Sequence, residues 1–383
     1  MSAEADLVKP ARQAAPEPGV SFDLTPSDEQ RMMVDAVRDF AARQVRPAAA
    51  EADHSCRTPP PLLAAAGALG LSATGIPTAH GGPLDERATV TSALIAEALA
   101  EGDMGIAVAC LAPGGVATAL GLWGDAEQQA THLPALAAEM PPAAAIAIME
   151  PRALFDPFAL RTQARRTAGG DILLDGVKSL VPRGAECGLL LVAAAVDGGP
   201  SLLLVEPNAG TSVVPAPGMG VRSAATASIT FEQVRLPQRA LLGESDPQVY
   251  AELVARSRLA WSALAVGTGA AVLAYVSEYV NQRTAFGEPI SNRQSVAFMV
   301  ADMATEIESI RLATLRACSL AESGRPFTRE AALAHALTVA QATAIGSDGV
   351  QLLGGHGYTR EHPVERWFRD LRAAGIFIGA LAL

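Results

Sequence analysis

Apolar positions along the chain change their spacing twice, and the changes divide the sequence into three regions. In residues 24–141, and again from about residue 250 onward, apolar positions recur with the period of amphipathic helices. Residues 143–237 instead carry short apolar runs between turn residues, which is typical of strands. We therefore predict an α+β fold with three domains: a helical domain over residues 23–141, an antiparallel β domain over 142–240 and a second helical domain over 245–383.

A helix-start signal opens the first region. Thr25 is expected to cap the helix, with Pro26 at the first helical position and Asp28 at the third. We expect this helix to end at Pro47, after apolar positions with helical spacing at Met33, Val37, Phe40 and Val45. Residues 1–22 mix charge, alanine and proline without the apolar core of a signal peptide, so we expect a disordered tail there.

The middle region contains five segments that predict strands. They are short, apolar and separated by Gly-Gly, Asp-Gly and Asn-Ala-Gly turns. Their sequences are AAAIAIM (143–149), DILLDGVKSLV (171–181), CGLLLVAAAV (187–196), PSLLLVEP (200–207) and ATASITFEQVRLP (225–237).

Two helices are prominent in the last region. One has charged positions such as Asp302 and Arg311 opposite an apolar face made of Met299, Met303, Ile307, Ile310 and Ala317. The other, residues 259–277, is apolar all round and long enough to span a bilayer. Its small residues favour a helix buried on all sides of a globular fold. Gly267-Thr268-Gly269 within it lacks the third glycine and the preceding strand of a dinucleotide fingerprint, which indicates close helix packing.

Composition narrows the classes of partner. Half of the residues are hydrophobic, and the net charge of -11 argues against nucleic-acid binding. The four cysteines are scattered and form no CxxC pair, and the six histidines form no paired ligand set, so we expect no metal site and no disulfide framework. Reduced cysteines are typical of a cytoplasmic protein, and we expect neither a membrane nor a nucleic acid as partner.

Three long motifs near the end of the chain resemble the acyl-CoA dehydrogenase family. They are RTAFGEPISNRQ (283–294), ADMATEIESIRLATLRA (301–317) and DGVQLLGGHGYTREHPVERWFRD (348–370), in the family's order and spacing. FEQVRLPQRALLGE (231–244) and AHGGP (79–83) extend the resemblance over nearly the whole chain after the tail. The resemblance implies an acyl-CoA dehydrogenase-like fold, with a helical domain, a middle β domain and a C-terminal four-helix bundle.

The resemblance also implies FAD as cofactor, bound between two subunits. Arg283 matches the arginine that meets the FAD pyrophosphate, where a guanidinium offers a planar fork to phosphate oxygens. Phe286 and Gln294 match neighbours of the cofactor, and Gln351, Gly354 and Gly355 match a loop that lets backbone approach the dinucleotide. These six residues belong to the half of the site that one subunit offers to its neighbour.

The other half, which holds the flavin ring of the same chain, departs from the family pattern. The family's Thr-Glu-Pro strand end and Ala-Gly-Ser-Asp stretch become Met149-Glu150-Pro151 and, after Arg152, Ala153-Leu154-Phe155-Asp156. The family's Trp-Ile-Thr-Asn becomes residues 180–183, Leu-Val-Pro-Arg. Pro182 removes a hydroxyl and a backbone N–H that the flavin edge uses.

The family's catalytic glutamate is absent as well. In most members it precedes a glycine near the end of the chain, where this sequence has Ile378. A minority places it on the helix before the arginine motif, where this sequence has Ser257. General-base catalysis of this kind is worth about 10² to 10⁴ in rate. Glu252 is expected to face elsewhere, because five residues turn a helix by about 140°. No catalytic residue is therefore predicted.

Two features of the substrate site match in part. Arg258 aligns with an arginine that contacts acyl-CoA in the family, although the acid that usually precedes it by three residues is Ala255. The backbone N–H of Ile378 matches one of the family's two donors to the thioester carbonyl, and a change of side chain leaves it in place.

Three functions are compatible with this asymmetric loss. The first is a non-catalytic subunit that completes the FAD site of a catalytic acyl-CoA dehydrogenase homologue, in an α2β2 complex like those of actinobacterial steroid side-chain breakdown. The second is a homo-oligomeric flavoenzyme, such as a homotetramer, with different chemistry on an acyl thioester. The third is a flavin-free scaffold that keeps only the fold. The retention of contacts to a neighbour's FAD, with loss of the chain's own, favours the first.

Overall fold

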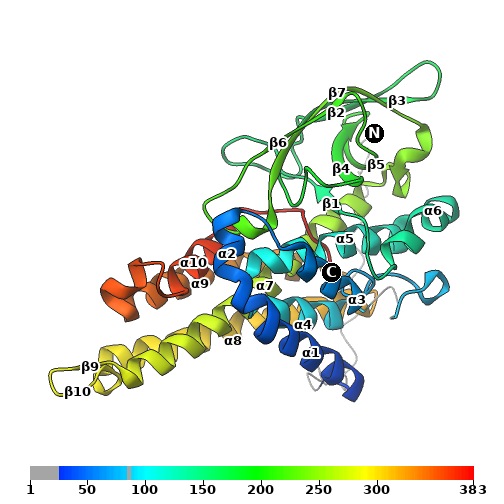
Figure 1. Ribbon diagram of the computed structural model, residues 1–383. Helices are drawn as coiled ribbons and strands as arrows, with labels where there is room; N and C mark the ends of the chain where they lie inside the picture. The colour runs from blue at the N-terminus through cyan, green and yellow to red at the C-terminus, as the bar shows by residue number, and fades with distance from the viewer. Residues whose placement is uncertain (1–25, 84–87) are drawn as a thin grey trace, which may run out of the picture.

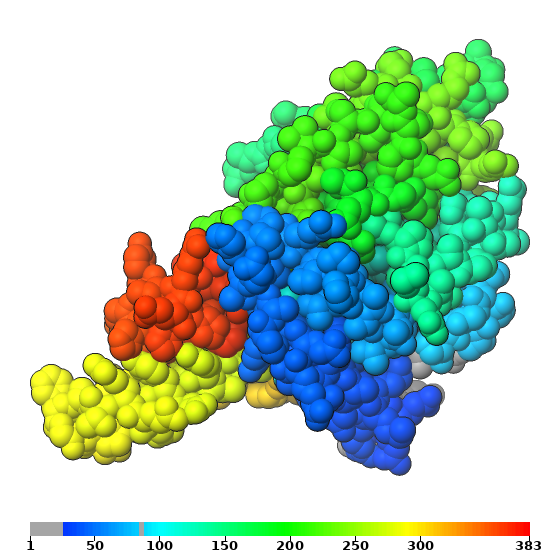
Figure 2. All heavy atoms as spheres, in the orientation of Figure 1, coloured from blue at the N-terminus to red at the C-terminus, as the bar shows by residue number. Residues whose placement is uncertain are grey.

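The computed structural model describes residues 26–83 and 88–383; the predicted tail 1–22 lies outside the described residues. Helices from both ends of the chain pack together, and the β domain lies on one side of them (Figure 1). Two long helices, α8 (Gln294–Glu322) and α9 (Thr328–Leu353), extend away from the β domain. Their far end carries a short hairpin, so the molecule has a body and a projecting tip (Figures 1 and 2).

The first helix differs from its prediction at both ends. Its N-cap is Ser27, which forms a capping box with Gln30, because the hydroxyl and the amide reach each other's backbone N–H. Pro47 does not end the helical path: a π-helical turn precedes it, and Pro47 lies in the first turn of the next helix, where a missing N–H costs nothing. The helices of this region are α1 (Asp28–Phe40), η1 (Ala41–Val45), α2 (Arg46–Ser55), α3 (Pro60–Ala68), α4 (Thr89–Ala100), α5 (Met104–Trp123) and α6 (Ala126–Leu136).

All five predicted strand segments form strands, and three short strands were not predicted. The predicted ones are β1 (Ala144–Ala147), β3 (Ile172–Val181), β4 (Leu189–Val196), β5 (Gly199–Val205) and β7 (Ala227–Leu236). The additional ones are β2 (Gln163–Arg166), β6 (Thr211–Pro215) and β8 (Leu241–Leu242). Asp197 and Gly198 both have positive φ, as a tight β4–β5 hairpin turn requires.

The sheet of the middle domain is mainly antiparallel, as predicted, and contains two parallel pairings. β1 and β2 both pair with β4 in parallel, at Leu189–Val192 and at Ala195–Val196 respectively. Because β5 covers the other edge of β4, β1 and β2 follow one another along the same edge. The loop 148–162 interrupts them, and the family's flavin-binding stretch falls in this loop.

Four helices form the C-terminal domain of the described chain. They are α7 (Pro247–Gln282), α8, α9 and α10 (Val364–Ala373), with the hairpin β9 (Thr284–Ala285) and β10 (Glu288–Pro289) between α7 and α8. The predicted apolar face of α8 packs inward, with Met303, Ile307, Ile310 and Ala317 buried. Two described helices, α5 and α7, are long and apolar enough to cross a membrane by composition, and both are mostly buried in the fold.

Gly267 shows why α7 carries small residues. A Cβ built on Gly267 would lie 2.0 Å from the carbonyl oxygen of Glu97 on α4. The two helices therefore approach closely only because the side chain is a hydrogen, which confirms close packing as the role of Gly267-Thr268-Gly269.

A buried ionic cluster joins the three domains. Asp103 caps α5 through the N–H of Ile106, accepts from the hydroxyl of Ser223 at 2.8 Å and pairs with Arg366 of α10 at 3.2 Å. Asp370, also on α10, accepts from the N–H of Val221 at 2.6 Å. Burial and the neighbouring Asp103 raise the pKa of Asp370 to about 8.

Candidate functional site

Ser257 and Ile378, the two positions that the resemblance aligns with the family's base, lie near each other, because Ser257 hydrogen-bonds to the residue after Ile378. The hydroxyl of Ser257 accepts from the N–H of Gly379 at 2.7 Å and donates to the carbonyl of Gly379 at 3.1 Å. Trp261, one turn further along α7, also donates to this carbonyl, at 3.0 Å. Both positions therefore reach the same point, and a serine and an isoleucine occupy them.

Glu252, the acid nearest to Ser257 along α7, forms a structural ion pair. Glu252 pairs with Arg256 at 2.8 Å, one helical turn away. Its side chain thus has a partner other than Ser257, in line with the prediction that it faces elsewhere. Arg256 is 2% exposed and donates to the carbonyl of Leu383 at 2.6 Å. The pair therefore holds the end of the described chain against α7.

Arg258 lies half-buried on α7, facing α9. Its Nε atom is shielded from solvent and has no hydrogen-bond partner in the part of the chain that the structure describes. Burial lowers the pKa of the Arg258 guanidinium, and burial together with Arg258 lowers the pKa of His335 on α9 to about 4. The backbone N–H of Ile378 likewise has no hydrogen-bond partner among the described residues. The Arg258 Nε and the Ile378 N–H thus remain available as donors.

The strand end at residues 149–151 is held by a buried ion pair. Glu150 accepts from the backbone N–H of Thr162 at 2.8 Å and from the ammonium of Lys178 at 3.2 Å. Burial lowers the pKa of Lys178 to about 8, against the opposing charge of Glu150. Burial opposes ionisation of Glu150 too, but the Thr162 hydrogen bonds and Lys178 hold the pKa of Glu150 below its usual value. Glu150 therefore joins β1, β2 and β3 and serves the fold.

Arg152 hydrogen-bonds within the loop that follows, residues 152–159. No role was predicted for this residue. Its guanidinium donates to the carbonyl of Asp156 at 3.1 Å and to that of Ala159, and lies 5.1 Å from the ring centre of Phe155. Leu154, where the family has glycine, has φ 50° and is 99% exposed. The arginine therefore bridges two carbonyls of its own loop.

The second flavin-binding stretch shows the same change. Leu180 and Arg183 both have positive φ, and Pro182 between them is buried. Arg183 pairs with Glu186 at 2.9 Å instead of presenting an amide. Without the hydroxyl and N–H that Pro182 replaces, this side of the chain does not fit a flavin ring.

The projecting tip brings most of the predicted cofactor contacts together. A groove of about 980 Å³ lies between the end of α7, the β9–β10 hairpin, the start of α8 and the end of α9. Five of the six predicted contacts line it: Arg283, Phe286, Gln351, Gly354 and Gly355. Gln294 begins α8 between Arg293 and Ser295, which line the groove, but its own side chain is not part of the described lining. Figure 2 shows this tip standing clear of the body.

Arg283 gives the groove an unpaired positive charge. Its side chain is exposed and forms no ion pair within residues 26–83 and 88–383, whereas the nearby Arg293 pairs with Glu288 at 3.0 Å. Phe286 is 95% exposed, and Arg293 lies over its ring at 5.7 Å. The unpaired guanidinium can bind an anion, and the exposed aromatic ring beside it can pack against a flat ring of the same ligand.

Two glycines open the floor of the groove. Gly354 ends α9 with φ 60° and ψ −134°, a conformation open to glycine, and exposes the next peptide unit. A Cβ built on Gly354 or Gly355 would meet no atom within 4 Å. The bare backbone and Arg283 fit the diphosphate of a dinucleotide such as FAD.

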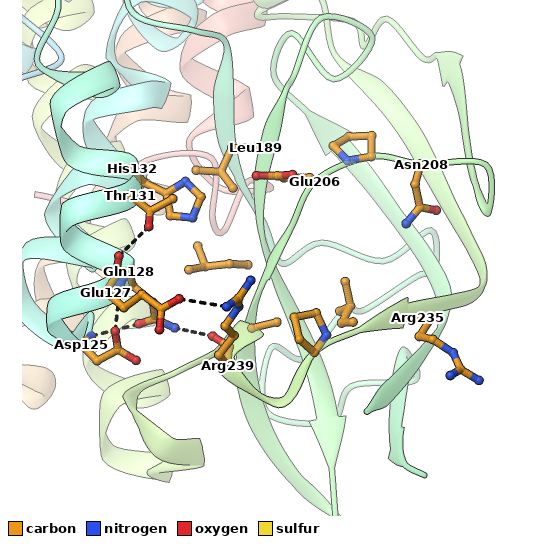
Figure 3. A pocket seen from close by; sticks show the side chains of 15 residues that line it. Asp125, Glu127, Gln128, Thr131, His132, Leu189, Glu206, Asn208, Arg235 and Arg239 are labelled. Atoms are coloured by element: carbon orange, nitrogen blue, oxygen red, sulfur yellow. Dashed lines mark hydrogen bonds and ion pairs between the residues drawn. The ribbon is translucent and has the colours of Figure 1, made fainter. Parts of the chain in front are cut away.

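A second pocket, of about 380 Å³, lies between α6 and the β domain (Figure 3). Both arginines that line it are already paired. Glu127 pairs with Arg239 at 2.9 Å, and the Gln128 amide donates to the carbonyls of Arg239 and Leu241 at 2.8 Å each. Arg235 pairs with Asp171 at 3.1 Å. The contacts of Glu127 and Gln128 connect α6 with the β domain.

Comparison with known proteins agrees with the fold over the whole described length. Models of the acyl-CoA dehydrogenase N-terminal, middle and C-terminal domains match residues 27–140, 145–234 and 248–382. The chain is 32% identical over 363 residues to the mitochondrial short/branched chain specific acyl-CoA dehydrogenase of Bos taurus, covering 92% of this chain and 83% of that one.

Solved structures give the same result. Butyryl-CoA dehydrogenase from Megasphaera elsdenii superposes with a TM-score of 0.86 at 27% identity, covering 93% of this chain and 96% of that one. The FAD complex of PigA shares the fold, with a TM-score of 0.85 at 24% identity, over 93% of this chain and 95% of that one. The fold and the domain order are those of the acyl-CoA dehydrogenase type of protein. The chain belongs to the acyl-CoA dehydrogenase family.

Proposed function

We propose that this chain is a non-catalytic subunit of a cytoplasmic acyl-CoA dehydrogenase complex, in which its tip completes the FAD site of a catalytic homologue. One observation carries the proposal: the exposed, unpaired Arg283 and the open glycine floor stand at a projecting tip, while the chain's two base positions carry serine and isoleucine. The reaction served is α,β-dehydrogenation of an acyl-CoA thioester, on the partner's flavin and with the partner's base.

Each residue of the tip has a defined task in this proposal. The Arg283 guanidinium neutralises diphosphate charge, the backbone at Gly354 and Gly355 approaches the phosphates, and Phe286 covers an apolar part of the cofactor. FAD supplies the hydride acceptor when it is bound. Arg258 and the N–H of Ile378 retain the capacity to bind an acyl-CoA carbonyl or phosphate, without a group that removes a proton.

The outer faces of the bundle support an assembly of several subunits. Phe298, Leu312 and Leu333 on α8 and α9 are 63%, 47% and 55% exposed. Large apolar side chains on one helical layer are typical of a surface that another subunit covers. We propose an α2β2 tetramer of the kind that acts in actinobacterial steroid side-chain breakdown.

Co-expression with a catalytic acyl-CoA dehydrogenase homologue from the same genome tests the proposal. We expect the chain alone to purify without flavin, and the complex to carry FAD and to oxidise an acyl-CoA. Arg283→Ala is expected to lower FAD retention by the complex about tenfold or more, since a charge-assisted contact is worth about 1.5 to 3 kcal/mol.

Arg325→Ala provides the matched control, because Arg325 is an exposed arginine in the turn between α8 and α9, at the opposite end of these helices from the tip. A flavin-loaded, active chain without any partner would overturn the proposal in favour of a homo-oligomeric enzyme. A complex that keeps its FAD when Arg283 and Gln351 are both alanine would favour a scaffold.

A further inference from the structure

Two histidine–tyrosine pairs lie directly behind the groove. The Tyr279 hydroxyl of α7 is 3.0 Å from Nδ1 of His356, and the Tyr275 hydroxyl, one turn earlier, is 2.7 Å from Nδ1 of His362. The two imidazole rings stack, with centroids 5.4 Å apart and planes inclined by 16°.

Contact with the groove distinguishes the first pair from the second. His356 and Tyr279 both line it, together with Arg283 and the glycine floor, and His356 is exposed. A neutral imidazole carries one proton, so the hydrogen-bond partner of one nitrogen decides the role of the other. The single proton of the Tyr279 hydroxyl has two acceptors in reach, Nδ1 of His356 at 3.0 Å and the carbonyl of Leu353 at 3.5 Å, and the shorter contact favours Nδ1. With the hydroxyl donating to Nδ1, the imidazole proton lies on Nε2, and Nε2 becomes a donor.

We propose that His356 is a further contact to the diphosphate of the dinucleotide, donating from Nε2, and that Tyr279 is its positioning residue. This inference rests on the proposed function, since it takes the groove as the place of the FAD diphosphate. Arg283 brings one positive charge to a group that carries two negative charges, and His356 adds a directional donor beside it. The stacked His362 holds the plane of the His356 ring.

The test uses the assembled complex with three variants at the tip. His356→Leu keeps volume and removes the donor; we expect FAD to bind about 10- to 100-fold more weakly, the range for a lost hydrogen bond to a charged group. His356→Gln returns an amide N–H near the position of Nε2 and is expected to recover most of the affinity. Tyr279→Phe is expected to cost about threefold to tenfold, and the same change in a His356→Leu background to add little.

Competition with FAD separates a diphosphate contact from a structural role. ADP is expected to compete less well in His356→Leu than in the unchanged complex, while adenosine, which has no phosphate, competes equally in both. His132→Leu, in the pocket beside α6, is the control histidine change.

Three results decide the question. Equal loss of ADP and adenosine competition would show a structural role and overturn the inference. Unchanged FAD affinity in His356→Leu, alongside a loss in Arg283→Ala, would overturn the inference and leave the proposed function in place. Unchanged affinity in both variants, or a complex without FAD, would overturn both.

Discussion

The Ser257 hydroxyl and the backbone of Gly379 hydrogen-bond in both directions, at 2.7 and 3.1 Å. The first residue occupies one of the family's two base positions, and the second directly follows the other. Both partners are buried, Ser257 completely. The hydroxyl therefore holds the C-terminal segment against α7.

Ser257→Ala is expected to destabilise the fold without affecting catalysis by the complex. The N–H of Gly379 would lose its acceptor in a buried place, which costs about 1 to 3 kcal/mol. Urea unfolding measures the change in free energy, and acyl-CoA oxidation by the complex measures the activity. Ser347→Ala is the control, because this exposed serine donates to a carbonyl of its own helix. A large loss of activity at unchanged stability would show that Ser257 takes part in the reaction.

Returning a carboxylate to the usual base position is expected not to create an enzyme. In Ile378→Glu the acid would stand beside Ser257, but the chain still has the closed loop at Arg152 and the buried Pro182 where flavin donors are needed. We expect no acyl-CoA-dependent dye reduction by this variant without its partner. Ile376→Glu, at a position 53% exposed, controls for the added charge. Dehydrogenation by the solitary Ile378→Glu protein would show that this chain holds a working flavin site.

Much of the architecture could be predicted from the spacing of apolar residues, because this spacing is a local property of the sequence. The pairing of β1 and β2 with one edge of β4 could not, since it depends on how the loop between them folds. The same holds for Arg152, whose partners are backbone carbonyls that exist as a set only in the folded loop. The family resemblance pointed to Arg283, Gln351 and the glycine pair, and the structure brings these residues to one groove. The His356–Tyr279 contact joins residues 77 positions apart and leaves no local pattern.

The domain junction is expected to make stability depend on pH. The pKa of Asp370 is raised from 3.8 to about 8 by burial and by Asp103, so the folded state binds a proton that the unfolded state releases above pH 4. Its contribution to stability is fully present below pH 3.8 and is lost as pH rises to about 8, by up to about 1.4 kcal/mol per pH unit. Across this window, the free energy of unfolding is expected to fall with rising pH.

Asp370→Asn tests this dependence. The amide oxygen can still accept from the Val221 N–H but does not titrate, so the variant is expected to show a flatter profile between pH 5 and 8. Thermal unfolding at a series of pH values provides the measurement. Asp302→Asn, an exposed acid on α8, is the control. A profile unchanged by Asp370→Asn would place the titrating group elsewhere.

Two glycine-to-alanine changes separate the fold from the cofactor contact. Gly267→Ala places a Cβ 2.0 Å from the Glu97 carbonyl oxygen, so α4 and α7 must move apart, at a cost of about 1 to 3 kcal/mol or more. Gly355→Ala places its Cβ in open space, and we expect stability within about 0.5 kcal/mol of the unchanged protein. The same methyl group would stand where the diphosphate approaches the backbone, so FAD retention by the complex is expected to fall about tenfold, or about 1.4 kcal/mol. Thermal unfolding of the chain and flavin absorbance of the complex measure the two effects. Full FAD retention in Gly355→Ala would mean that no ligand approaches this part of the groove.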